Sequence, residues 1–446
     1  MDDVIKHSQA FRIRRFVNWF PLGLSYALLY MGRYNLTVSQ TVLGNLMPKD
    51  AFGTIFGVGA WVYAIAFLLN GPITDRIGGK RGVLIGVFGA AIANLLMGLY
   101  IRYAVSLPEG VTISIVPVFT ILYALNMYFQ SYGAVAIVKV NAHWFHVKER
   151  GTFSGIFGIM ISTGLFLAFD VSEKILRMVH ESGGTASNGV WWVFFAPAIL
   201  LLTFFVIEIF LLKDKPSQAG FEDFDTQDAS SGEADTSPKI FDILKKVLTN
   251  KIILIIALTE FCTGVLRNGV MHWFKIFAKE HIKAGDMVGW QFVNDNWGLM
   301  LMIAGITGGM IAGVVSDKLF GSRRPPVAAI LYGLMFFTVI LMIPYLQNGW
   351  VLGALVFVIS ICVIGTHGVL SGTATMDFGG RKGAATAVGI IDGFVYLGTG
   401  FQSLSLGFIT MRNWLFWPVF LIPFTLLGIF LLSRIWNATP LKKTSN

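Results

Sequence analysis

The segment Gly82–Ile101, GVLIGVFGAAIANLLMGLYI, is a run of twenty residues without a single charge. The segment Pro325–Met376 continues for fifty-two residues without Asp, Glu, Lys or Arg, and only the turn-like Pro344–Gly349 interrupts it. About twenty apolar residues are enough for a helix to cross the hydrocarbon core of a bilayer. The first segment therefore predicts one transmembrane helix, and the second predicts two.

The composition of the whole chain agrees with these two segments. Of 446 residues, 55% are hydrophobic and only 13% are charged, and the mean hydropathy is +0.68. Soluble domains carry about twice that share of charge. We therefore expect an all-α membrane protein with twelve transmembrane helices. The first six lie near 16–38, 54–74, 82–104, 112–142, 152–171 and 190–212, and the second six near 251–278, 288–315, 326–346, 350–375, 384–410 and 414–436.

The distribution of basic residues predicts the orientation in the membrane. If both termini are cytoplasmic, inside segments hold 23 of the 34 Lys and Arg residues, outer segments hold 8 and span interiors hold 3. Loops rich in Lys and Arg stay inside, so we predict cytoplasmic termini and a multi-pass protein of the cell membrane, most simply a bacterial inner membrane. The net charge of +9 is then explained by contact with anionic lipid, without a nucleic-acid partner.

The sequence also argues against a signal peptide, a disulfide framework, a metal site and an enzyme. The short polar start, 1–11, leads into a full-length span, so we expect no cleaved signal peptide. The two cysteines, Cys262 and Cys362, lie inside predicted spans, which excludes a disulfide framework or a CxxC metal site. There is no Walker loop, HExxH or suitably placed GxSxG motif, so we predict neither an enzyme nor a bound metal or cofactor.

A polar stretch divides the chain into two similar halves. Residues 213–250 are rich in Asp, Glu, Ser and Gly, and are expected to form a cytoplasmic linker between halves 1–212 and 251–446. The halves share loop motifs: Gly71–Arg76 after the second helix matches Gly313–Lys318 after the eighth. Two tandem six-helix repeats around a central site resemble the plan of a major facilitator transporter. We predict a gating role for the charged residues of these loops, namely Asp75, Arg76, Arg81, Asp317, Lys318, Glu149 and Arg150.

Arg33 and Arg267 are charges in the middle of predicted spans. Each such charge costs several kcal/mol, so we look for function at these positions. They lie at similar depth in the first helix of each half, and each falls on a polar helix face. Two guanidinium groups that face one cavity would form a multi-donor clamp for phosphate or carboxylate. The alternative is that each arginine pairs with a protein carboxylate such as Glu260 or Asp295, or lies near the membrane surface.

Asp392 is the most unusual charge, because it lies eight residues into a predicted span with Tyr396 one turn further on. Three roles remain open: a counter-ion for an arginine, a contact with a cationic or hydroxyl group of the substrate, or the site of a coupling proton. Asp295 carries the same ambiguity. Lys139 lies five residues before Trp144 and can extend to the cytoplasmic surface instead of contacting a substrate.

Several motifs resemble those of the organophosphate:phosphate antiporters, a family that includes the bacterial glycerol-3-phosphate and hexose-phosphate transporters. They are Gly32–Asn35, His143–Phe145, Lys148–Gly151, Leu266–Gly269, Ser316–Phe320, Lys382–Ala385 and Tyr396–Gly398. The resemblance implies that Arg33 and Arg267 bind the phosphate. It also places Lys139 and Asp295 at positions that are basic and acidic in glycerol-phosphate transporters. With them, we include Tyr30, Tyr34, Asp392 and Tyr396 among the predicted substrate-binding residues.

The chain also departs from the family pattern. Ile161 stands where the glycerol-phosphate transporters have a substrate-contacting histidine. Tyr34 replaces a lysine and His272 replaces its acidic partner, so both members of an expected ion pair are absent together. These changes bear on which substrate is carried and on exchange with phosphate.

We therefore predict a monomeric secondary transporter of a small organic anion, in particular a phosphorylated metabolite. It would work by alternating access, in antiport against phosphate or another phosphate ester. Two alternatives remain: a proton-coupled organic anion symporter, and a sugar-phosphate sensor that binds without transport.

Overall fold

The computed structural model describes residues 7–108, 113–146, 150–181, 189–224, 226, 249–321, 323–374 and 384–438. The side chains of Asp75, 150–157, 372–374 and 384–388 lie outside this description. Two of the predicted gating residues, Glu149 and the side chain of Arg150, therefore also lie outside it.

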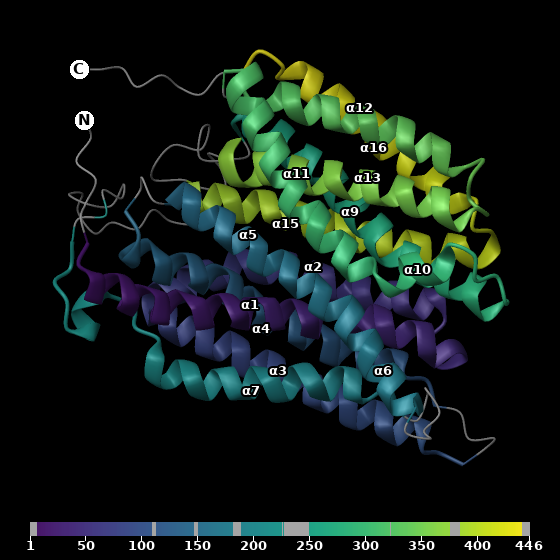
Figure 1. Cartoon of the computed structure of the whole chain (residues 1–446), viewed down its shortest axis with the longest axis horizontal. Coiled ribbons are helices and arrows are strands. Elements are labelled where there is room, and N and C mark those ends of the chain that lie inside the picture. The colour runs from purple at the N-terminus through teal and green to yellow at the C-terminus, as the bar shows by residue number, and fades with distance from the viewer. Residues whose placement is uncertain are drawn as a thin grey trace.

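The described chain is built of helices arranged in two bundles (Figure 1). The N-terminal half contains α1 (Gln9–Leu43), α2 (Lys49–Ile77), α3 (Gly79–Val105), α4 (Val116–Trp144), α5 (Arg150–Phe166), α6 (Ser172–Glu181) and α7 (Trp192–Leu211). The C-terminal half contains α9 (Lys251–Lys283), α10 (Trp290–Asp295), α11 (Trp297–Leu319), α12 (Arg324–Met342), α13 (Gly349–His367), α15 (Ala384–Arg412) and α16 (Phe416–Arg434).

The twelve predicted spans coincide with long helices. In the part of the chain that the structure describes, nine helices are long and apolar enough to cross a membrane: α2, α3, α4, α7, α9, α11, α12, α13 and α16. The other three predicted spans are α1, α5 and α15. Charged residues make two of these helices less apolar: α1 carries Arg33 and α15 carries Asp392. Helix α5 is short instead, with only 17 residues before the π-helical segment Leu167–Val171. Each of these three less apolar or shorter spans contacts the other half, as the apolar helices α2 and α11 also do.

The two halves meet along helix pairs α2–α15 and α5–α11. At one end of the α2–α15 pair, a Cβ added to Gly53 would lie 2.4 Å from the carbonyl oxygen of Ser403. Further along the same pair, a Cβ at Gly393 would lie 3.7 Å from the carbonyl oxygen of Ala64. The helices are thus closest where glycines permit backbone contact, and they separate from this end toward the other.

Helix α1 begins and α16 ends at the same end of the molecule (Figure 1). We call it the proximal end, and we call the opposite end, where α1 and α9 finish, the distal end. The start of the expected linker is packed on the proximal end: Asn18 Nδ2 and Trp144 Nε1 both donate to the carbonyl of Lys213, and the Phe221 and Phe224 rings contact Phe11.

Gly264 provides a test of the helix contacts in the C-terminal half. A Cβ at this position would lie 1.9 Å from the carbonyl oxygen of Val395, so Gly264→Ala must push α9 away from α15. We expect a loss of about 1–3 kcal/mol in unfolding free energy, measured as a lower thermal unfolding temperature in detergent.

Gly313→Ala in α11 is the matched control, because a Cβ there would meet nothing within 4 Å. It should be neutral or stabilising by up to about 1 kcal/mol. Equal unfolding temperatures for the two variants would contradict the α9–α15 contact.

Candidate functional site

Arg33 lies fully buried in the middle of α1, and the partners that the structure shows for it are neutral. Its Nε donates to Gln130 Oε1 at 2.8 Å, and its Nη1 donates to the Tyr396 hydroxyl at 2.5 Å. The guanidinium carbon lies 4.7 Å from the centres of both the Tyr30 and Tyr63 rings. An aromatic face and hydroxyl dipoles therefore stabilise the cation without neutralising it.

Arg267 approaches the same tyrosines from the opposite half. It interacts electrostatically with the hydroxyl groups of Tyr30, Tyr34 and Tyr396, and its Nε is buried without a hydrogen-bond partner. Tyr34 interacts with both arginines. The structure therefore brings five of the predicted residues together at the interface between the halves.

The sixth, Asp392, belongs to a polar cluster beside Arg267. His367 Nδ1 lies 2.8 Å from Glu260 Oε2, and Ser371 donates to the Asp392 carboxylate. Both carboxylates interact electrostatically with His367 and Arg267. Glu260 is fully buried, and its second oxygen has no hydrogen-bond partner. Unlike Arg33, Arg267 thus has carboxylates close by.

Tyr34 and His272, which replace the expected ion pair, face each other across the two halves. Their ring centres are 5.0 Å apart, and the His272 Nδ1 is hydrogen-bonded to the Thr37 hydroxyl at 2.7 Å. An aromatic and hydrogen-bonded contact therefore occupies this interface. Ile161 is a partly buried apolar residue that packs against the core.

Two predicted residues lie away from the arginines. Asp295, at the end of α10, pairs with Arg177 of α6 and accepts two hydrogen bonds from Gln291. Lys139 lies near the proximal end of α4, where it interacts with His143. The structure thus does not bring Asp295 and Lys139 to the arginine pair.

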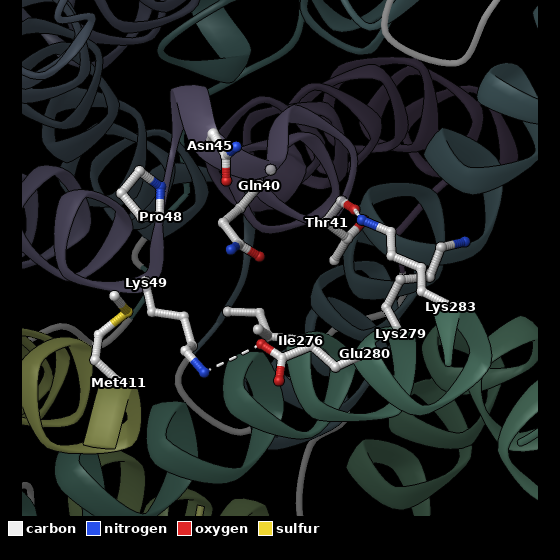
Figure 2. Close-up of a pocket in the computed structure, with 11 residues that line it drawn as sticks. Gln40, Thr41, Asn45, Pro48, Lys49, Ile276, Lys279, Glu280, Lys283 and Met411 are labelled. Atoms are coloured by element: carbon white, nitrogen blue, oxygen red, sulfur yellow. Dashed lines mark hydrogen bonds and ion pairs between the residues drawn. The ribbon is translucent and has the colours of Figure 1, made fainter. Parts of the chain in front are cut away.

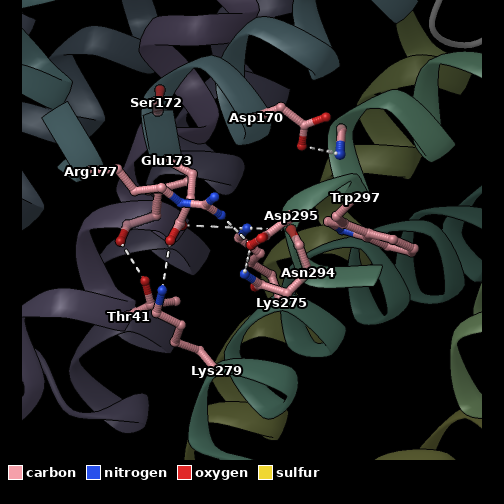
Figure 3. A network of polar contacts seen from close by, with 12 residues as sticks. Thr41, Asp170, Ser172, Glu173, Arg177, Lys275, Lys279, Asn294, Asp295 and Trp297 are labelled. Atoms are coloured by element: carbon pink, nitrogen blue, oxygen red, sulfur yellow. Dashed lines mark hydrogen bonds and ion pairs between the residues drawn. The ribbon is translucent and has the colours of Figure 1, made fainter. Parts of the chain in front are cut away.

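Asp295 is part of a network of charges that joins the halves at the distal end (Figure 3). Glu173 of α6 binds Lys279 at 2.6 Å and the fully buried Lys275 at 3.4 Å. Nearby, the Asp170 carboxylate accepts from the backbone N–H groups of Gly298 and Leu299 at the start of α11. Among the described residues, every ion pair that crosses between the halves lies at this end. The distal end is therefore closed by electrostatic contacts.

Glu173 remains ionised in this network. Burial alone would raise its pKa, but Lys275 and Lys279 outweigh that effect and hold the pKa of Glu173 at about 2. Glu173 lies in α6, beyond the predicted span 152–171. Because the pKa is below the unfolded value of about 4.3, the stabilisation is present at neutral pH and is lost as the pH falls through this range.

Those predicted gating residues whose side chains the structure describes lie at the proximal end, whereas Glu149 and the side chain of Arg150 are outside the described part of the chain. Asp317 pairs with Arg324 at 2.7 Å within the C-terminal half, and Arg76, Arg81 and Lys318 are exposed. The side chain of Asp75 lies outside the described residues.

Sequence reasoning missed Glu173, Lys275 and His367. The predicted span ended at residue 171, which left Glu173 in a loop, although the helix continues through α6 to Glu181. Lys275 lay inside a predicted span but close to its end. Glu173 lies more than one hundred residues from Lys275 and Lys279 in the sequence, so only the tertiary structure reveals these contacts.

Comparison with protein families matches residues 22–403 to the Major Facilitator Superfamily. The glycerol-3-phosphate transporter of Bacillus subtilis (strain 168) is 26% identical over 98% of this chain and 95% of its own. A probable hexose phosphate transport protein of Chlamydia muridarum (strain MoPn / Nigg) is 24% identical over 98% and 93%. A membrane sensor protein, UhpC of Escherichia coli (strain K12), is also related, at 23% identity over 84% and 82%.

Among solved structures, a bacterial homolog of the human lysosomal transporter Spinster superposes with a TM-score of 0.72, at 12% identity, over 97% of this chain and 99% of that one. This likeness confirms the predicted fold of two six-helix bundles.

Glu173→Gln tests the charge network at the distal end. It would leave the buried Lys275 without its anionic partner, which costs about 3–5 kcal/mol in buried pairs, so the closed distal end should lose stability. A cysteine at Thr41, with Cys262 and Cys362 replaced by Ser, should then react faster with a thiol reagent added from the distal side. Glu181→Gln, at the exposed end of the same helix, should leave the rate unchanged. Equal rates in both variants would show that Glu173 does not hold this end closed.

Proposed function

Because the chain belongs to the Major Facilitator Superfamily, we propose that it is a secondary transporter of a phosphorylated organic anion, and that it exchanges this substrate for phosphate or another phosphate ester. The observation that carries the proposal is the pair Arg33 and Arg267, which approach one group of tyrosines from opposite halves.

The chemistry of this group suits a phosphate ester. A phosphate monoester carries close to two negative charges near neutral pH and several acceptor oxygens. Two planar guanidinium groups match it in charge and offer paired donors, and the tyrosine hydroxyls can donate to the remaining oxygens. The Arg267 Nε supports this assignment, since it is a buried donor without a hydrogen-bond partner in the described structure. Tyr30, Tyr34 and Tyr396 are the proposed hydroxyl contacts.

The position of the arginines between the halves supports alternating access. A substrate held by both arginines contacts both bundles, so rocking of one half against the other exposes it to each side in turn. In this scheme 1–212 and 251–446 are the moving units and 213–250 connects them. The charge network at the distal end is the gate on one side of the membrane. The gate on the other side is formed by the loops that carry the predicted gating residues, namely Asp75, Arg76, Arg81, Glu149, Arg150, Asp317 and Lys318. The protein acts as a monomer in the lipid bilayer, with the termini in the cytoplasm.

For Asp392 we propose the counter-ion role. Asp392 and Glu260 balance the charge of Arg267 while the site is empty, and His367 interacts with both carboxylates. A phosphate dianion then competes with Asp392 for Arg267. We assign Lys139 and Asp295 no direct substrate contact, because their neighbours are His143 and Arg177 respectively.

Two other functions follow from specific observations. The buried Glu260–His367–Asp392 cluster is able to hold a proton, which favours proton-coupled symport as the second candidate. The related sensor protein favours binding without transport as the third. Uptake driven by a pH gradient without a counter-anion distinguishes the symporter, and binding without any flux distinguishes the sensor.

Arg33→Lys and Arg267→Lys test the proposed phosphate site. Lysine keeps the charge but loses the planar pair of donors, so exchange of labelled glycerol 3-phosphate, hexose phosphate or inorganic phosphate in proteoliposomes should fall at least about a hundredfold. Arg412→Lys, at the exposed distal end of α15, should leave it unchanged. Unaltered thermal unfolding would show that folding is intact, and near-normal exchange in either variant would refute the clamp.

Asp392→Asn separates the counter-ion from the proton-site role. As a counter-ion, its loss should weaken transport by about tenfold or less, equivalent to about 1.4 kcal/mol, without changing the pH dependence. The measurement is the initial rate of exchange between pH 6 and pH 8. Preserved exchange together with complete loss of pH-driven accumulation would instead assign the coupling proton to Asp392.

A further inference from the structure

A polar cavity lies between the halves at the distal end (Figure 2). Its volume is about 270 Å³, enough for a phosphate group with part of its ester. The N-terminal half contributes Gln40, Thr41 and Lys49 to its wall, and the C-terminal half contributes Lys279, Glu280 and Lys283. The cavity is separate from the arginine pair, because its lining comes from the last turns of α1 and α9 and the first turn of α2.

The wall of this cavity is positively charged. Three lysines face a single carboxylate, and that carboxylate is already bound: Glu280 accepts from Lys49 at 3.1 Å and from the Trp414 ring nitrogen at 2.6 Å. Helix α2 also begins here, so the unpaired N–H groups of its first turn and the positive end of its dipole border the cavity. The potential therefore favours an anion.

Of the three lysines in the cavity wall, Lys283 has the weakest acceptor as its direct partner. The hydrogen-bond partner of its ammonium group is the Thr41 backbone carbonyl, at 2.5 Å, and Glu280 and Glu173 act on it only through longer-range electrostatic attraction. By contrast, Lys49 pairs directly with Glu280 and Lys279 with Glu173. A carbonyl carries only a partial negative charge, so an incoming phosphate oxygen would be a stronger acceptor.

The same contacts hold the two halves together at this end. Lys283 to Thr41, Lys49 to Glu280 and Lys279 to Glu173 all join one half to the other. An anion that binds these lysines competes with each cross-half contact at once. Binding of an anion in the cavity thus weakens the contacts that close the distal end, because the anion and these contacts use the same lysines.

We propose that this distal cavity is a low-affinity capture site for the phosphate group of the substrate, and that its occupation promotes opening of the distal end. The proposal rests on the proposed function for the identity of the anion. Lysines suit such a role, because ammonium groups on flexible stems attract phosphate as point charges, while the planar arginines at the centre impose a defined geometry.

Protection of Lys283 from amine acetylation, followed by mass spectrometry, tests the site without requiring transport. The full-length protein in phosphatidylcholine nanodiscs should be acetylated at Lys283 at least about threefold more slowly with inorganic phosphate than with chloride at equal ionic strength. Lys174, exposed on α6 at the same end, is the internal control and should be unaffected. Equal labelling of Lys283 in both salts would overturn the proposal.

Two further experiments determine where the protecting anion binds and whether it is free phosphate or a lipid headgroup. Protection should persist in the Arg33→Lys variant, and its loss there would assign the effect to the central site. Nanodiscs with phosphatidylglycerol distinguish a lipid headgroup from free phosphate: protection by this lipid, with no further effect of phosphate, would overturn the capture role.

Transport measurements then test the consequence for the substrate. Lys283→Gln should raise the KM for glycerol 3-phosphate or hexose phosphate supplied at the distal side about fivefold or more, with a smaller effect at high salt, and leave kcat nearly unchanged. Lys174→Gln should leave KM unchanged. An unchanged KM in Lys283→Gln would overturn the capture role. If the wild-type protein shows no flux at all, the proposed transport function is contradicted, and the acetylation experiment alone then tests the anion site.

Discussion

The structure depends on the burial of a guanidinium ion at the centre of a membrane protein. Arg33 is fully buried, and its visible partners are an amide, hydroxyl groups and aromatic rings. Such neutral groups offset only part of the cost of removing a charge from water. The surrounding helices must therefore present many dipoles to one point: Gln130 comes from α4, Tyr63 from α2 and Tyr396 from α15. The close packing of α2 on α15 brings the last two together, with ring centres 4.2 Å apart.

The charged residues between the two halves fall into two groups, one at the distal end and one at the centre, which differ in their partners. At the distal end, acids and bases from opposite halves form direct pairs, such as Glu173 with Lys279 and Lys49 with Glu280, which hold the halves in one relative position. At the centre, Arg33 contacts an amide and tyrosines, and Arg267 lies near tyrosines with Glu260 and Asp392 close by. Direct pairing at the centre would satisfy the cations permanently and leave nothing for an anion to gain. The separation of the two regions allows one to close the molecule while the other remains able to bind.

Much of this architecture could be predicted from the sequence, because it follows from hydrophobic length and from repetition. Each predicted span overlaps an observed helix, although the predicted span 288–315 is broken at Asn296 and its long helix, α11, begins only at Trp297. The equivalent depth of Arg33 and Arg267 indicated a shared site. Asp295 could not be placed in the same way. It lies at the end of the short helix α10, where a break before α11 directs the chain toward Arg177. Glu173 was hidden because the π-helical segment 167–171 disturbs the helical period just before it. Both cases depend on local breaks in helices, which hydropathy does not register.

The two halves contribute unequally to the potential at the centre, although their folds repeat. Arg33 has neutral partners, but Arg267 has Glu260 and Asp392 beside it, and His367 is hydrogen-bonded to Glu260 and interacts electrostatically with Asp392. The positive potential is therefore strongest on the side of α1. The face formed by α9, α13 and α15 combines acceptors with a single cation. Two pseudo-symmetric arginines thus have unlike surroundings. Among the described residues, Glu260, His367 and Asp392 produce this difference, because they supply ionisable groups near Arg267 where Arg33 has an amide, hydroxyl groups and aromatic rings.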